Sequence, residues 1–136
     1  MTLVVDASVA LTWCFADERR AETDAIGERV SAEGAIVPAL FHLELANVLL
    51  IAVRRHRVTF NDMSEKLADV AALPIVADDE TIARAWTNIL VLARDERLTA
   101  YDAAYLELAL RLGLPLATLD GDLAAAARRR GVEVLP

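Results

Sequence analysis

Short, uniformly apolar runs alternate along this chain with longer segments in which apolar residues recur at helical spacing. Runs of this kind are typical of strands that are buried on both faces of a parallel sheet. They predict strands at 3–5, 35–37, 74–76, 115–119 and 133–135. The longer segments predict helices at 7–14, 18–32, 39–56, 60–72, 79–94, 102–112 and 121–130. The alternation predicts an α/β fold, a three-layer α/β/α sandwich with a short central parallel sheet.

Glycine and proline mark two of the predicted boundaries. Gly113, followed by Pro115, ends one predicted helix and precedes a strand, and Gly131 ends the last helix in the same way. The sequence contains no linker, internal repeat or low-complexity segment. We therefore expect a single domain that spans residues 1–136.

Composition narrows the classes of protein that fit. Hydrophobic residues make up 56% of the chain, and the longest apolar stretch, 37–53, is interrupted by polar residues and is short for a membrane span. No signal peptide is visible, and the single cysteine, Cys14, excludes a disulfide framework. We expect a cytoplasmic protein without membrane association. The net charge of −7 means that nucleic acid would be bound through a local basic patch, or that the acids hold metal ions.

Two aspartates lie where parallel strands end. Asp6 follows the first predicted strand and Asp120 follows the fourth, and the carboxyl ends of such strands are where α/β proteins form their sites. Each aspartate could instead be a helix N-cap, and the same alternative holds for Asp102. Asp122 would lie in the first turn of the last helix, where the helix dipole favours an acid.

Glu44 is harder to explain as a structural residue. It is flanked by Leu43 and Leu45 inside a predicted helix that is apolar on the same face. An unpaired buried carboxylate costs several kcal/mol or becomes neutral. A structural role would require pairing with an arginine, for example Arg54 or Arg55 near the end of the helix.

The acids make chemical sense as one group. Asp102 shares its helix face with Tyr105 and Leu106, so it points toward the core. Carboxylates gathered together raise one another's pKa unless a cation lies between them, and ligand sets made only of oxygen select Mg²⁺ or Mn²⁺. Such ions lower the pKa of a bound water and support in-line attack at phosphorus. Phosphodiester hydrolysis therefore suits a site built from Asp6, Glu44, Asp102 and Asp120.

Four segments, in order along the chain, carry a resemblance to a known family. They are 4-VVDASV-9, 41-FHLELANVL-49, 99-TAYDAAYLELA-109 and 116-LATLDGDLAAAARRRGVEVL-135. With these motifs the chain resembles the PIN-domain nucleases and, within them, the VapC toxins of bacterial toxin–antitoxin pairs. The resemblance covers essentially the whole chain.

The resemblance implies an activity, a metal site and partners. It implies a Mg²⁺-dependent endoribonuclease, with Mn²⁺ as an alternative ion, that forms a homodimer and is inhibited by a small cognate antitoxin. The antitoxin would place an arginine-bearing segment near the acidic pocket. The resemblance assigns Asp6, Glu44, Asp102 and Asp120 as catalytic metal ligands, Ser8 and Thr118 as accompanying hydroxyls, and Asp122 as an additional acid.

Arginine clusters offer candidate contacts to RNA. They include Arg54 and Arg55 at the end of one predicted helix and Arg128, Arg129 and Arg130 at the end of another. The alternative is a solvated helix end that is favoured by the helix dipole. For the dimer surface, the apolar helices near 39–53 and 86–93 are candidates.

Other functions remain compatible with an α/β fold. A phosphotransfer enzyme with an aspartate nucleophile, like the haloacid dehalogenase group, would require a second aspartate where Ser8 stands. A receiver domain would require a lysine beside the acids, whereas Lys66 lies in a polar predicted helix. A non-catalytic α/β module that binds a partner protein should have lost at least one of the acids.

Overall fold

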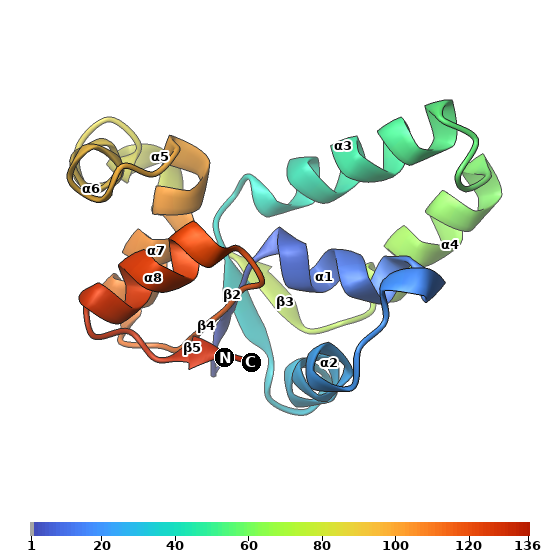
Figure 1. The fold of residues 1–136 in the computed structure, drawn as a ribbon, viewed down its shortest axis with the longest axis horizontal. Helices are drawn as coiled ribbons and strands as arrows, with labels where there is room; N and C mark the ends of the chain where they lie inside the picture. The colour runs from blue at the N-terminus through green and yellow to red at the C-terminus, as the bar shows by residue number, and fades with distance from the viewer. Residues whose placement is uncertain (1) are drawn as a thin grey trace.

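The computed structural model describes residues 2–136, and its centre is a five-stranded, wholly parallel sheet (Figure 1). The strands lie in the order β3-β2-β1-β4-β5. They are β1 (Val4–Val5), β2 (Ala35–Val37), β3 (Ile75–Ala77), β4 (Leu116–Ala117) and β5 (Val134–Leu135). All five predicted strands are present, although the predicted strand 115–119 is shorter than expected.

Helices cover both faces of this sheet, which confirms the predicted three-layer fold. On one side α2 and α3 pack against α1, and α4 packs against α1 and α3; on the other side α7 contacts β1 and β4, with α6 and α8 packed on α7 (Figure 1). The helices are α1 (Ala7–Cys14), α2 (Ala21–Glu33), α3 (Phe41–Arg54), α4 (Phe60–Ala71), α5 (Thr81–Arg84), α6 (Asn88–Glu96), α7 (Ala100–Leu112) and α8 (Gly121–Arg129). A short 3-10 turn, Ala16–Glu18, precedes α2.

The central strand β1 is the most deeply buried element. Leu3, Val4 and Val5 are fully buried, and so are Leu116 and Ala117 of the neighbouring strand β4. Because helices cover both faces, no alternation of polar residues is needed along these strands, which explains the uniformly apolar runs in the sequence.

The central position of β1 in the sheet determines where a ligand site is expected. The chain passes from β1 to β2 and β3 on one side, and later returns to β4 on the other side of β1. The carboxyl ends of β1 and β4 therefore form the point at which the strand order reverses, where α/β sheets bind their ligands. The backbone N–H of Asp6 donates to Ala117 at 2.9 Å, so the residues that follow the two strands emerge side by side.

The prediction of one helix over 79–94 was wrong. The chain instead forms the single turn α5 and then α6, with a break at Thr87, whose backbone is not helical (φ −120°, ψ −97°). Polar side chains hold α5 in place: Thr81 donates to Asp78, and Arg84 contacts Glu107 of α7. Ile82 of α5 and Trp86 in the turn that follows it are 83% and 90% exposed.

The predicted helix end at Gly113 is confirmed. Gly113 follows α7 in the left-handed region (φ 65°), which a residue with a β-carbon adopts less readily. Within residues 2–136, no helix is long and apolar enough to cross a membrane.

Candidate active site

Asp6 is a buried carboxylate at the carboxyl end of β1, with 5% of its surface exposed. Its Oδ2 accepts hydrogen bonds from the hydroxyls of Ser8 (2.8 Å) and Thr118 (2.7 Å). Both hydroxyls are themselves fixed, because Ser8 Oγ accepts from the backbone of Leu119 and Thr118 Oγ1 from the backbone of Asp120. Asp6 occupies the N-cap position of α1 without a side-chain capping bond, so capping does not explain it.

The surroundings of Asp6 raise the pKa of its carboxyl group above the ordinary value. Burial raises the pKa of this carboxyl group, and the hydrogen bonds from Thr118 and Ser8 offset only part of that effect. Hydroxyl groups carry no charge, so the negative charge of Asp6 is solvated but not neutralised.

Glu44 lies in the first turn of α3 and is half-buried. Its Oε1 accepts a hydrogen bond of 2.5 Å from the hydroxyl of Tyr105 in α7. Burial raises the pKa of Glu44, the hydrogen bond from Tyr105 opposes this, and the charges of Asp6 and Asp102 raise it further. No ion pair joins Glu44 to an arginine among the described residues, so the alternative of a structural pair with Arg54 or Arg55 is not observed.

The expected reason for the burial of Glu44 was wrong. The core face of α3 is formed by other residues, such as Phe41 and Leu45, whereas Leu43 is 75% exposed and Val48 is partly exposed. Glu44 is fixed instead by the hydrogen bond from Tyr105 of α7, which lies 61 positions away in the sequence. Helical spacing alone cannot reveal a contact of this range.

Asp102 lies in the first turn of α7, where the Thr99 hydroxyl caps the helix by accepting from the Asp102 backbone N–H at 3.1 Å. Burial and the charges of Asp120 and Asp6 raise the pKa of Asp102 to about 6, and the charge of Asp122 contributes. These carboxylates, which are distant in sequence, therefore lie close enough to act on one another's ionisation.

Asp120 both caps a helix and acts on Asp102 through its charge. Its Oδ1 accepts from the backbone N–H of Leu123 at 2.8 Å, so the N-cap interpretation is correct for this residue. Its charge also raises the pKa of Asp102. Asp122 lies in the first turn of α8 and is exposed.

The chemistry of this pocket fits a hard divalent cation. The atoms that could bind a metal ion are all carboxylate oxygens, the ligand type that Mg²⁺ and Mn²⁺ prefer. The hydroxyl groups that hold Asp6 and Glu44 are uncharged. The raised pKa values of Asp6, Glu44 and Asp102 indicate that negative charge is disfavoured here. Among the ion pairs of residues 2–136, none involves the five acids of this pocket. We call Asp6, Glu44, Asp102, Asp120 and Asp122 together the hydroxyl-held acids, after the hydroxyl groups that hold the first two. The carboxylate of Asp120 is held by a backbone N–H instead.

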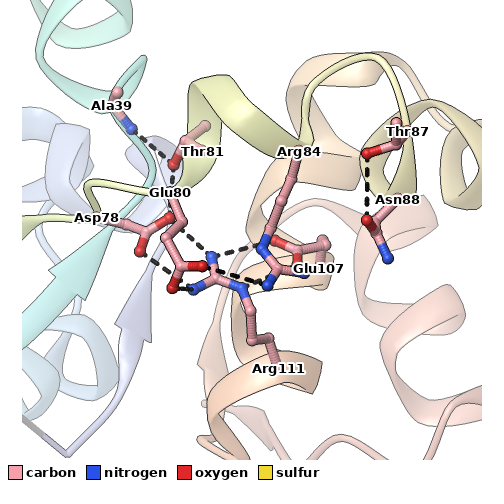
Figure 2. A network of polar contacts seen from close by, with 9 residues as sticks. All are labelled: Ala39, Asp78, Glu80, Thr81, Arg84, Thr87, Asn88, Glu107 and Arg111. Atoms are coloured by element: carbon pink, nitrogen blue, oxygen red, sulfur yellow. Dashed lines mark hydrogen bonds and ion pairs between the residues drawn. The ribbon is translucent and has the colours of Figure 1, made fainter.

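A second acidic cluster follows β3. Asp78, Asp79 and Glu80 can each place a carboxylate oxygen within 4.8 Å of the others, a spacing that is compatible with a metal ion. Two of the three are already bound by arginine: Arg111 donates to Asp78 Oδ2 at 2.7 Å and to Glu80 Oε2 at 3.1 Å (Figure 2).

Other contacts complete this second cluster. Arg111 also bonds Glu107 Oε1 at 2.9 Å, and Arg84 contacts Glu107 and Glu80 (Figure 2). Burial raises the pKa of Asp78, but the bonds from Arg111 and Thr81 together lower it below its usual range. A metal ion would have to displace Arg111, so we interpret this group as structural. We call it the arginine-held acids: Asp78, Glu80 and Glu107.

Sequence reasoning missed Tyr105 and most of the arginine-held acids. Glu107 and Arg111 form an ion pair at i,i+4 spacing within α7. The contact of Arg111 with Asp78 joins residues 33 positions apart, and no local pattern signals it. For Tyr105, the signal was its position one turn after Asp102 on the same face of the helix.

The candidate RNA-binding arginines have different surroundings. Arg129 and Arg130 both pair with Glu96, each at 2.8 Å. Arg54 and Arg55 are exposed at the far end of α3, ten residues or more from Glu44, which corresponds to about 15 Å along a helix. Arg128 is exposed in the last turn of α8.

Solved structures with the same fold come from several organisms. PAE2754 from Pyrobaculum aerophilum is 26% identical with a TM-score of 0.73, and the match covers 98% of this chain and 90% of that one. VapC20 from Mycobacterium tuberculosis, described as a sarcin–ricin loop cleaving toxin, is 21% identical with a TM-score of 0.60, covering 99% and 100%. FitAcB from Neisseria gonorrhoeae is 19% identical with a TM-score of 0.55, covering 98% and 96%. No relative among curated protein sequences matches the chain.

The profile of one family matches nearly the whole sequence. It is described as the PIN domain, and the match spans residues 3–129, which include every one of the hydroxyl-held acids. The parallel sheet and its strand order agree with this match. The chain belongs to the PIN-domain family.

Proposed function

We propose that this protein is a metal-dependent endoribonuclease and acts as the toxin of a toxin–antitoxin pair. One observation carries the proposal: carboxylates from β1, α3, α7 and the start of α8 influence one another's ionisation while lacking any arginine partner among the described residues. Membership of the PIN-domain family, whose members are typically nucleases, supports the same reaction class.

The residues of the chain would divide the work of binding and orientation. Asp6 would be the central ligand, because its Oδ2 is occupied by the hydroxyls of Ser8 and Thr118 and its other oxygen takes part in neither bond. Glu44 would bind through the oxygen that Tyr105 leaves free. Asp102 at the start of α7 and Asp120 at the start of α8 would complete the set of metal ligands.

A bound Mg²⁺ or Mn²⁺ would lower the pKa of a water molecule and offset the negative charge of the phosphodiester. The pocket favours exchange of protons for a cation, because Asp102 has a pKa of about 6 and Asp6 and Glu44 are also shifted upward. Metal binding near pH 6 should therefore release protons from the carboxyl group of Asp102.

RNA would approach an acidic protein through local positive charge. Arg54, Arg55 and Arg128 have no ion-pair partner among the described residues, which favours them over Arg129 and Arg130 as contacts to phosphate groups. Replacing Arg128 by Gln should raise KM for RNA and reduce its salt dependence more than the same change at Arg129.

A cognate antitoxin and a second copy of the chain are the proposed protein partners. The fold shared with VapC20 and FitAcB is consistent with both. The segment from α5 to α6 exposes the apolar side chains Ile82, Trp86, Leu90 and Val91, which supports the 86–93 region as the dimer surface. Sedimentation equilibrium tests this: Trp86→Asp should dissociate a dimer, whereas Leu43→Asp on α3 should not.

The nuclease activity is tested with purified protein and RNA. Cleavage should require Mg²⁺ or Mn²⁺, and Asp6→Asn should lower its rate at least about a hundredfold, since even partners of metal ligands are worth 10–100-fold. Asp79→Asn is the matched control, because Asp79 is exposed and belongs to the second acidic segment. Equal cleavage by Asp6→Asn and wild type, or full activity in EDTA, would refute the proposal.

The toxin role is tested separately in cells. Expression of the protein should arrest growth, expression of Asp6→Asn should not, and a small protein encoded beside it should relieve the arrest. If the protein cleaves RNA with metal but does not arrest growth, the nuclease activity stands and the toxin role is rejected.

A further inference from the structure

Tyr105 brings a buried hydroxyl from α7 to the acidic site. It projects from α7 and is fully buried, with 0% of its surface exposed. Its hydroxyl donates to Glu44 Oε1 across 61 positions of sequence, and it is also influenced by Asp6 and by the backbone N–H of Ala7 at the start of α1. The hydroxyl therefore lies where α1, α3 and α7 meet.

The hydrogen bond from Tyr105 restricts the orientation of the Glu44 carboxylate. Glu44 stands on α3, whose core contacts are made by other residues, and its side chain is only half-buried. A glutamate has three rotatable side-chain bonds and loses their freedom only when a partner fixes it. A single short hydrogen bond to Oε1 restricts the carboxylate and leaves Oε2 outside that bond.

The choice of tyrosine also matters. In the arginine-held acids, the donor brings a full positive charge and neutralises the carboxylate. The hydroxyl of a tyrosine is ordinarily uncharged at neutral pH and donates one hydrogen bond. It can thus hold Glu44 in place while leaving the negative charge available.

We propose that Tyr105 is a positioning residue: its buried hydroxyl holds Oε1 of Glu44 and thereby presents the second oxygen of that carboxylate to the pocket shared with Asp6 and Asp102. The inference rests on the proposed metal site and concerns the orientation of one ligand within it. Tyr105 touches neither the metal nor the substrate.

Binding of Mn²⁺, followed by the electron paramagnetic resonance signal of the free ion, tests the inference without reference to activity. Tyr105→Phe should weaken Mn²⁺ binding by about 10–100-fold, the range found when partners of metal ligands are removed. Tyr101→Phe is the matched control, since Tyr101 lies one turn earlier on the same helix and is 66% exposed. This control should bind Mn²⁺ like the wild type.

A second background separates positioning from packing. In Glu44→Gln, where the charged ligand is already lost, adding Tyr105→Phe should change Mn²⁺ affinity less than twofold. In RNA cleavage, Tyr105→Phe should leave KM for RNA unchanged, and its reduced rate should recover as Mn²⁺ is raised. A general loss of structure would not recover in this way.

The outcomes distinguish this inference from the proposed function. Wild type that binds no Mn²⁺ overturns the metal site itself. Wild type that binds Mn²⁺ while Tyr105→Phe binds it equally well overturns only the role of Tyr105. If Tyr105→Phe does not fold, recovery of folding in the double variant with Glu44→Gln supports the hydroxyl–carboxylate bond, because removing both partners leaves no unpaired charge. Persistent unfolding of the double variant overturns the inference in favour of packing.

Discussion

The hydroxyl-held acids and the arginine-held acids are both made of aspartate and glutamate, but their hydrogen-bond donors differ. Asp6 is held by two hydroxyls, whereas Asp78, similarly buried, is held by a guanidinium and a hydroxyl. The pKa of Asp6 is raised and that of Asp78 is lowered. The spacing of carboxylates alone would favour Asp78, Asp79 and Glu80 as the metal site. The comparison teaches that the charge of the donors, more than the number of acids, distinguishes a site that needs a cation from one that already has one.

The two groups of acids also differ in their role in the protein. Arg111 has 13% of its side chain exposed and connects Asp78 and Glu80, which follow the edge strand β3, with Glu107 of α7. The charges in this cluster compensate one another and fix α5 and the end of β3 in place. In the pocket of Asp6, the remaining repulsion between carboxylates is a cost in stability that a bound cation would remove.

The largest expected effect comes from breaking the arginine-held acids. Arg111→Gln should destabilise the protein by about 3–5 kcal/mol, because it leaves buried carboxylates without their cation. Urea unfolding followed by circular dichroism measures this change. Arg29→Gln, which removes an exposed pair with Glu33 on α2, should leave the midpoint unchanged. Equal stability of Arg111→Gln and wild type would show that the cluster is not structural.

A matched pair of substitutions should give opposite signs in metal-free protein at pH 7. Asp78→Asn should destabilise by about 1–3 kcal/mol, since it loses charge-assisted hydrogen bonds from Arg111. Asp102→Asn should raise the unfolding midpoint by a smaller amount, because the folded protein disfavours the charge of this half-buried group. Thermal melts of the two variants in EDTA compare them directly. The same sign in both variants would remove the distinction between the clusters.

Metal ions should act on only one of the clusters. At ten times the dissociation constant, Mg²⁺ should stabilise the wild type by about 1.4 kcal/mol, if it binds the native state alone. Asp6→Asn should lose this stabilisation and Asp78→Asn should retain it. Melts with and without Mg²⁺ provide the measurement, and retention of the effect in Asp6→Asn would place the ion elsewhere.

The smallest expected effect is the pH dependence of metal-free protein. Asp102, Asp6 and Glu44 have raised pKa values, so their contribution to stability is present at low pH and is lost as pH rises through the folded pKa, about 6 for Asp102. Lowering the pH from 7.5 to 5.5 should therefore raise Tm, by about 2 °C. Acids with lowered pKa values, such as Asp78, lose their contribution only at more acidic pH.

Two controls sharpen this pH experiment. Saturating Mg²⁺ should flatten the dependence between pH 5.5 and 7.5, and Asp102→Asn should weaken it. A Tm that falls toward pH 5.5 in metal-free wild type would contradict the assigned shifts.

The fold could be read from the sequence because its signals are local. Uniformly apolar strands, helical spacing and Gly113 predicted the layers and most boundaries, and only the 79–94 segment was assigned the wrong element. That error has a physical cause: the polar contacts of Thr81 with Asp78 and of Arg84 with Glu107 hold α5 separately from α6.

The candidate site was predictable only in part. Asp6 and Asp120 follow strands whose neighbours could be inferred, so their proximity was a topological consequence. Glu44 was chosen on the expectation of an apolar helix face that proved partly exposed, and its partner Tyr105 lies 61 positions away. Long-range hydrogen bonds of this kind depend on how helices pack, and single-sequence patterns do not record packing.

Helix α7 carries members of both clusters on one continuous rod. Asp102 and Tyr105 serve the pocket near its beginning, and Glu107 and Arg111 serve the ion network toward its end. Each residue of a helix turns the next by about 100°, so inserting or deleting one residue between Tyr105 and Glu107 would rotate one cluster away from its partners. Related sequences should therefore vary in length at the loops around α5 but align without gaps through this helix.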